Sequence, residues 1–199
     1  MSGDAHTALS DEARRWLLAW ARRSIRAELA HEPAESAPER PPEVEGLGAC
    51  FVSLHTHAGE LRGCIGTFDD SLPLWRNVEA MAKAAATHDY RFSRLTLAEL
   101  DTCAIEISAL SPRQPIKAED VIVGEHGLWI ASGVHHGVLL PQVAVSHGWD
   151  RETFLAHTCI KAGLPQNAWR DPHTEIEAFR GEVFSEHPDD AASDEPAQC

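Results

Sequence analysis

One short stretch of the sequence places a thiol and a guanidinium two residues apart between glycines. Glu60-Leu61-Arg62-Gly63-Cys64-Ile65-Gly66-Thr67-Phe68 has the pattern of the returning arm of a β-hairpin. Because side chains alternate across a strand, we expect Arg62 and Cys64 to share one face. Leu61 and Ile65 then occupy the other. A nearby guanidinium favours the thiolate, the reactive form of cysteine. The segment is also typical of a buried strand in which Cys64 is a small apolar side chain.

Two histidines in the preceding predicted strand have a spacing that suits joint metal binding. His55 and His57 would share one strand face, but the sequence offers no identifiable third ligand. We therefore predict no metal site and expect both side chains to be solvated. The hairpin register decides whether Ser53 or His55 lies beside Cys64.

A carboxylate lies in the clearest predicted strand of the chain. Residues 103–110 alternate so that one face is apolar and Glu106 lies on the other, between small residues. Such a carboxylate pairs with an arginine, and Arg62 and Arg91 are the candidates. Alternatively, this face forms the floor of a pocket in which the pKa of Glu106 is raised and the carboxyl exchanges protons. Arg91 follows a predicted helix between two aromatic residues, where it either anchors a turn or points into a cleft.

A further histidine lies at a predicted turn. Gly124 and Gly127 bracket Glu125 and His126, which predicts a tight hairpin with His126 at its tip. An exposed imidazole at such a position can serve as a general base if the fold brings a nucleophile to it.

Periodicity and capping signals predict the elements that must position these residues. We expect helices at 11–30 behind the cap Ser10, at 74–88, from Pro141 onward, and at 151–162. We expect strands at 49–57, 60–68, 103–110 and 174–184. Hairpin-like connections between strands and helices predict an α+β fold, with a mainly antiparallel sheet flanked by helices.

Composition divides the chain into one folded body and three irregular segments. We predict a flexible N-terminus at residues 1–9, a domain over 10–186, and a disordered acidic tail at 187–199. Within the domain, residues 31–48 are rich in Pro, Glu and Ala and predict a mobile connector, because proline prevents regular hydrogen bonding.

Charge and cysteine usage exclude several classes of protein. The formal net charge of -14, from 17 basic and 31 acidic residues, disfavours binding to nucleic acid or to an anionic membrane. The five cysteines form no CxxC pair, which argues against a zinc finger or a disulfide scaffold and indicates a reducing cytoplasm. No signal peptide or membrane-spanning run is visible. Phosphate-loop, dinucleotide-binding, zinc-protease and nucleophile-elbow motifs are missing too, and we predict no cofactor.

Six short segments occur in an order that resembles the AMMECR domain family, also called AmmeMemoRadiSam system protein A in prokaryotes. The resemblance covers roughly residues 10 to 186. The segments are Leu61-Arg62-Gly63-Cys64-Ile65-Gly66, Tyr90-Arg91-Phe92-Ser93, Ile105-Glu106-Ile107-Ser108, Gly124-Glu125-His126-Gly127-Leu128, Leu139-Leu140-Pro141-Gln142-Val143 and Lys161-Ala162-Gly163-Leu164-Pro165.

The resemblance implies a two-lobed α/β body with a larger lobe, a smaller lobe and a cleft between them. It implies no assigned reaction. Prokaryotic family members accompany, or are fused with, a Memo-like protein that resembles class III extradiol dioxygenases and a radical SAM protein. The residues that the resemblance suggests for a ligand- or partner-binding surface are Arg62, Gly63, Arg91, Gln142 and Lys161.

Two hypotheses from different classes follow. In the first, the chain is an accessory subunit that binds a Memo-like partner and helps to form a substrate pocket. In the second, it is a cysteine-dependent enzyme with Cys64 as nucleophile, His126 as base, and Glu106 or Gln142 orienting or polarising. Local roles stay open beside both hypotheses: Gln142 can cap a helix, and Lys161 can complement a helix C-terminus.

Overall fold

The computed structural model describes residues 8–33 and 36–186 and divides the chain into two compact units. The first unit comprises the chain up to Leu110 together with the residues from Glu182 onward, and the second comprises Ser111–Gly181. Helices and antiparallel strand pairs occur in both units, which confirms the predicted α+β class. The predicted flexible N-terminus, apart from residues 8 and 9, and the predicted acidic tail lie outside the described residues. The cleft between two lobes stays a prediction.

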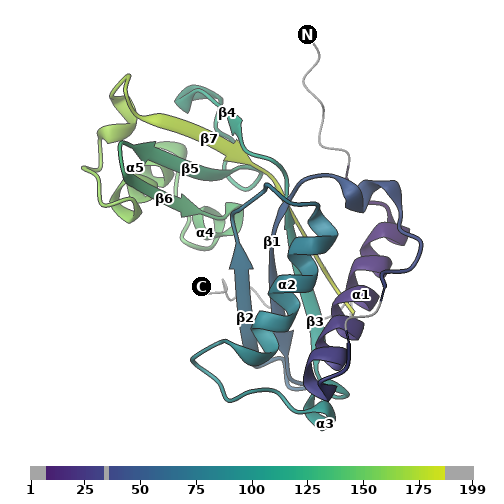
Figure 1. Ribbon diagram of the computed structural model, residues 1–199. Helices are drawn as coiled ribbons and strands as arrows, with labels where there is room; N and C mark the ends of the chain where they lie inside the picture. Colours follow the sequence, from purple (N-terminus) through teal and green to yellow (C-terminus); the bar gives the residue numbers. More distant parts are fainter. Residues whose placement is uncertain (1–7, 34–35, 187–199) are drawn as a thin grey trace. The chain divides into compact units, whose positions relative to one another are not determined.

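The first unit is a four-stranded sheet with the strand order β2-β1-β3-β8 (Figure 1). Its elements are α1 (Asp11–Ala30), η1 (Pro42–Glu45), β1 (Ala49–His55), β2 (Leu61–Thr67), α2 (Leu74–Thr87), α3 (Leu97–Leu100), β3 (Ala104–Leu110) and β8 (Gly181–Ser185).

Helices α1 and α2 cover one face of this sheet (Figure 1). The Ser10 side chain accepts a hydrogen bond from the Ala13 N–H and thereby caps α1, as predicted. Alternate residues of β1 and β3, including Val52 and Ile107, are fully buried in the same apolar cluster as Leu17 of α1. The period of two in the strands and the period near four in the helices thus meet in one core.

The register of the β1–β2 hairpin differs in part from the alternation expected along β2. Gly63 lies opposite Leu54, whereas Leu61 lies opposite His55, so Arg62 is the extra residue of a β-bulge. Leu61 therefore falls in register with the face that carries His55. The prediction that Leu61 and Cys64 lie on opposite faces is wrong, because the bulge shifts the alternation by one residue.

Parts of the predicted flexible segments belong to the core. The Leu9 backbone N–H donates to the Glu182 carboxylate, and the Leu9 side chain is buried. Within the predicted mobile connector, η1 carries the fully buried side chain of Val44. Proline at the start of η1 is compatible with a helical turn, since the first N–H groups of a helix have no partner within it.

The second unit has a four-stranded sheet with the order β4-β7-β5-β6. Its elements are β4 (Gln114–Pro115), η2 (Ala118–Asp120), β5 (Gly127–Ser132), β6 (His135–Leu139), α4 (Pro141–Ser146), α5 (Arg151–Lys161), η3 (Ala168–Arg170) and β7 (Glu175–Phe179). Its core joins Leu128 and Ile130 of β5 to Phe154 of α5. The Asp150 side chain caps α5 by accepting from the Thr153 N–H.

Two expectations for this part of the chain need correction. The predicted single strand at 174–184 is two strands, β7 in the second sheet and β8 in the first. The predicted hairpin at Gly124–Gly127 is a turn that leads into β5, whose strand partners are β6 and β7. Gly124 has a φ of 89°, so the predicted turn is present, but the residues before it do not form a strand.

Candidate functional site

Three polar side chains from neighbouring strands lie in one row across the first sheet. Ser53 of β1 is directly opposite Cys64 of β2 on one side and Glu106 of β3 on the other. The Ser53 hydroxyl lies 3.2 Å from the Cys64 sulfur. His55 follows two residues after Ser53 in β1 and therefore projects from the same face. We call the face that carries Ser53, His55, Cys64 and Glu106 the polar face.

His55 and Glu106 approach each other on the polar face. The His55 Nε2 atom lies 3.9 Å from Glu106 Oε1, and the two side chains are 20% and 21% exposed. Nε2 is buried and has no hydrogen-bond partner within the described residues. A buried ring nitrogen without a partner costs free energy unless another molecule satisfies it. The polar face therefore presents an unsatisfied group next to a carboxylate that solvent can reach.

The Cys64 backbone is held by an ion pair from the loop after α2. Its N–H donates to Asp89 Oδ2 at 2.8 Å, and its carbonyl accepts from an Arg91 terminal nitrogen at 3.1 Å. Asp89 and Arg91 also bind each other at 2.8 Å. The Cys64 backbone groups thus bond outward, away from β1, and its side chain then lies close to that of Ser53. Both backbone groups of Cys64, the N–H and the carbonyl, are therefore held in place by hydrogen bonds.

The Asp89 carboxylate is strongly favoured in its charged form. The hydrogen bond from Arg91 is the largest cause, and the backbone N–H groups of Cys64 and Arg91 add to it. Together they outweigh burial and hold the pKa of Asp89 at about 2. Since this side chain is only 2% exposed, its charge is compensated almost entirely by these partners.

Arg62 does not form the predicted pair with Glu106. Its guanidinium donates to Glu99 Oε1 at 3.0 Å and to the Ser93 carbonyl at 3.0 Å. Arg91 is paired with Asp89, as described above, and Glu106 faces His55. Arg62 is thus not the partner of Glu106, because it pairs with Glu99, which the strand pattern could not place. The alternative pairing of Glu106 with Arg91 stays a prediction.

Gly63 lies on the helix side of β2. A Cβ atom at this position would lie 2.4 Å from the Ala85 carbonyl oxygen of α2. Only glycine lets the strand approach the helix backbone so closely. Gly63 therefore lets β2 pack closely against α2. The position where its side chain would be faces α2 and not the polar face.

His57, the second of the two histidines considered for joint metal binding, lies outside the strand. β1 ends at His55, and His57 is exposed in the turn that follows. The expectation that both share one strand face is wrong, since the chain turns one residue too early. Across the described ranges, no three His, Cys, Asp or Glu side chains are grouped closely enough to hold a metal ion.

The remaining predicted site residues belong to the second unit. His126 precedes β5, and its Nδ1 accepts a hydrogen bond from the Ile122 N–H at 3.1 Å. In neutral imidazole the proton is then on Nε2, which donates rather than accepts. Burial, and to a smaller extent Arg180, lower the pKa of His126. Gln142 and Lys161 are exposed, in the first turn of α4 and the last turn of α5.

The role of Asp89 is not among the predictions made from the sequence. Asp89 and Arg91 are spaced two apart directly after a helix that ends at Thr87. An aspartate at such a position commonly accepts hydrogen bonds from the backbone two residues later, and Asp89 does accept from the Arg91 N–H. That local signal was present, but its contact with Cys64 spans 25 residues of sequence.

Comparisons with known proteins agree with the resemblance. The sequence model of the AMMECR1 family matches residues 18–184. Protein MJ0810 of Methanocaldococcus jannaschii is 43% identical over 160 residues, which cover 76% of this chain and 78% of that protein. Protein TK0174 of Thermococcus kodakarensis is 39% identical over 192 residues, with 89% and 92% covered.

A solved structure supports the same assignment. The crystal structure of the uncharacterized protein PH0010 from Pyrococcus horikoshii matches with a TM-score of 0.75 and 36% identity, covering 91% of this chain and 95% of that one. The family match spans most of the chain, and these relatives cover more than two thirds of it. The chain therefore belongs to the AMMECR1 family.

Proposed function

We propose that this protein is an accessory binding subunit whose polar face forms one wall of a pocket for a small polar substrate. The observation that carries the proposal is the buried His55 Nε2 without a partner, 3.9 Å from Glu106. A ligand group that bonds to this nitrogen would remove the cost of leaving it unsatisfied. Ser53 adds a hydroxyl on the same face, two residues away along β1.

The surroundings of Cys64 support a role as part of the pocket wall rather than as a nucleophile. The residue is 2% exposed, and its sulfur lies 3.2 Å from the Ser53 hydroxyl. The Asp89–Arg91 pair fixes its backbone. Reactive cysteines occupy electropositive and partly exposed positions, whereas buried ones are inert.

The proposed partner follows from the family resemblance. We infer that the chain works with a Memo-like protein of dioxygenase-type fold and with a radical SAM protein. Tyr90, which lies between Asp89 and Arg91, is 95% exposed, and this exposure supports a partner-binding surface around it. Exposed aromatic side chains are frequent anchors of protein interfaces. None of the four described cysteines forms a disulfide, which supports a reducing compartment such as the cytoplasm.

Co-purification tests this proposal. The tagged chain is expressed with the Memo-like protein of the same organism, and the complex is followed by size-exclusion chromatography over a range of salt and protein concentrations. We expect the two proteins to elute together and Tyr90→Ala to weaken the complex. Trp169 lies in η3 of the second unit, so Trp169→Ala serves as the aromatic control. Separate elution of the wild-type proteins under every condition would rule the proposal out.

A cysteine-dependent activity is the second candidate. It is favoured by one observation, that Cys64 and Glu106 lie in the same row of the polar face on either side of Ser53. In this candidate Cys64 is the nucleophile, Glu106 orients or polarises, and His126 is the base. His126 could accept a proton at Nε2 only after giving up its bond to Ile122. Turnover that is unchanged in Cys64→Ser excludes this candidate.

A further inference from the structure

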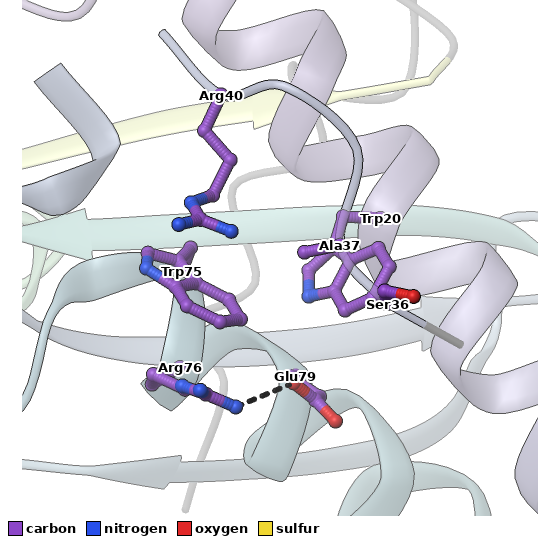
Figure 2. A pocket seen from close by; sticks show the side chains of 7 residues that line it. All are labelled: Trp20, Ser36, Ala37, Arg40, Trp75, Arg76 and Glu79. Atoms are coloured by element: carbon purple, nitrogen blue, oxygen red, sulfur yellow. Dashed lines mark ion pairs between the residues drawn. The ribbon is translucent and has the colours of Figure 1, made fainter. Parts of the chain in front are cut away.

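A pocket of about 290 Å³ lies on the helix side of the first unit, away from the residues of the polar face (Figure 2). It is formed by Trp20 of α1, by Trp75, Arg76 and Glu79 of α2, and by the connector between α1 and η1. The connector residues that line it are Ser36, Ala37 and Arg40. Its volume is close to the lower limit of small-molecule sites, so a small ligand such as a single substituted ring would fit.

A buried donor without a partner lines this pocket. Trp20 is 4% exposed, and its indole Nε1 has no hydrogen-bond partner within the described part of the chain. Figure 2 shows this nitrogen on the side of the ring that faces Trp75. The neighbouring indoles are satisfied, since Trp75 donates to Glu45 and Trp16 donates to the Glu39 carbonyl. Buried indole N–H groups usually find an acceptor, so the one on Trp20 marks a position for a ligand acceptor.

Two guanidinium groups at the pocket have N–H donors that are available to a ligand. Arg40 and Arg76 lie over the Trp75 ring at 4.5 and 4.0 Å, and Figure 2 shows them on opposite sides of it. Arg40 bonds to Glu45 through Nε alone, which leaves both of its terminal nitrogens without a hydrogen bond among the described residues. Arg76 approaches Glu79 at 3.9 Å and also acts electrostatically on Glu45, but it donates no side-chain hydrogen bond among the described residues. Stacking on an indole holds each guanidinium in place while its N–H groups point to the side.

The charges at the pocket favour an anion with a single negative charge. Two arginines and Glu79 line it, but Glu79 is bound by Lys83 at 2.7 Å and Arg40 by Glu45, so the charge of Arg76 is the one left to be matched. A carboxylate matches the planar fork of a guanidinium and can accept from the indole N–H as well. Apart from Ser36, the remaining lining, from the indole rings and Ala37, is apolar. We propose that this pocket binds a small monocarboxylate with an apolar body, whose carboxylate contacts Trp20 Nε1 and Arg76.

Titration with benzoate, followed by NMR of the indole N–H signals in the full-length chain, tests this assignment. The Trp20 signal is identified from its through-space contacts with Trp16 and Trp75, so no core variant is needed. We expect a saturable downfield shift of the Trp20 signal, because a hydrogen bond forms at Nε1. Arg76→Gln should weaken benzoate binding about tenfold, the effect of losing one charge-assisted hydrogen bond. Benzamide, which has the same shape without the charge, should cause no saturable shift.

A matched control exists in the second unit. Arg170 lies over Trp169 at 4.5 Å and is 62% exposed, against 4.0 Å and 58% for Arg76 over Trp75. Arg170→Gln should leave benzoate affinity unchanged. The proposal is overturned if the Trp20 signal does not respond up to the solubility limit of benzoate, if benzamide acts equally well, or if Arg76→Gln and Arg170→Gln have the same effect. None of these outcomes bears on the proposed partner complex or on the polar face, which separate experiments with Tyr90→Ala and Glu106→Gln test.

Discussion

Asp89 and Arg91 act toward Cys64 as a neighbouring strand would. The carboxylate accepts the N–H that β2 directs outward, and the guanidinium donates to the carbonyl beside it. β2 is an edge strand of its sheet, and edge strands expose backbone groups that invite pairing with other chains. The ion pair satisfies these groups at one residue and so both protects the edge and fixes the segment that bears Cys64.

The low pKa of Asp89 makes the folding stability depend on pH. The pKa in the folded protein is about 2, below the ordinary value of 3.8, so the stabilisation is complete above pH 4 and is lost as the pH falls toward 2. We expect Asp89→Asn to lower the free energy of unfolding by about 2 kcal/mol at pH 7. Urea unfolding at a series of pH values measures this, and the variant should lose less stability between pH 4 and pH 2.

Asp101→Asn is the matched control for that experiment. Asp101 is 59% exposed and pairs with Arg26 at the surface, so its loss should cost less than about 1 kcal/mol. Equal effects of the two substitutions at pH 7 would contradict the structural role assigned to Asp89.

Residue-scale prediction from sequence succeeded where contacts were local. The predicted Ser10 cap depends on a few consecutive residues. The partners of Arg62 depended on Glu99, which lies 37 residues away. A strand pattern specifies which face a side chain occupies, but it does not specify which distant charge meets it.

At the scale of elements, the approach of β2 to α2 depends on the absence of a side chain at Gly63. A methyl group there would lie 2.4 Å from the Ala85 carbonyl, and backbone cannot move aside as a flexible side chain can. We expect Gly63→Ala to lower the free energy of unfolding by about 1–3 kcal/mol, the usual cost of overpacking. Urea unfolding at pH 7 measures it.

Gly46→Ala is the control for this prediction. Gly46 has a φ of -61°, and an added Cβ would meet only the Glu43 carbonyl, at 3.4 Å. This substitution should be neutral or stabilise by a few tenths of a kcal/mol, because it restricts the unfolded chain. A Gly63→Ala variant as stable as Gly46→Ala would show that β2 and α2 are not packed as described.

Most elements could be predicted because their periodic patterns are long. α1 runs over Asp11–Ala30 as expected, and β3 and α5 differ from expectation by one residue at an end. The β-bulge at Arg62 and the division of 174–184 into β7 and β8 could not be predicted. Both arise from pairing with distant strands, which leaves the local hydrophobic pattern almost unchanged.

At the scale of the whole molecule, the chain leaves the first sheet after β3 and returns to it in β8. In the sequence, the second unit is thus an insertion between β3 and β8, which are neighbouring strands of the first sheet. The resemblance identified the family correctly because six ordered segments spread over both units carry it. The same segments divide by unit, with Cys64 and Glu106 in the first and His126, Gln142 and Lys161 in the second. None of the helices in the described ranges has the length and apolar character needed to span a bilayer.

The polar face can be tested apart from Tyr90 by changing one of its charges. Glu106→Gln keeps the shape of the side chain and removes its negative charge. Glu12→Gln makes the same chemical change at an exposed position of α1, on the helix side of the unit. Because only the first of these carboxylates lies beside His55, the two variants separate a role of the polar face from a general effect of charge.

The most direct test of the proposed binding role is the dissociation constant of the complex with the Memo-like protein, measured by isothermal titration calorimetry for the wild-type chain and both variants. We expect Glu106→Gln to weaken the complex, or the binding of its substrate, about tenfold or more. The reason is that the negative charge beside the buried His55 nitrogen is lost, and with it a charge-assisted contact to the ligand. Glu12→Gln should match the wild type. Equal constants for all three proteins, with and without substrate, would contradict the claim that the polar face forms part of the binding site.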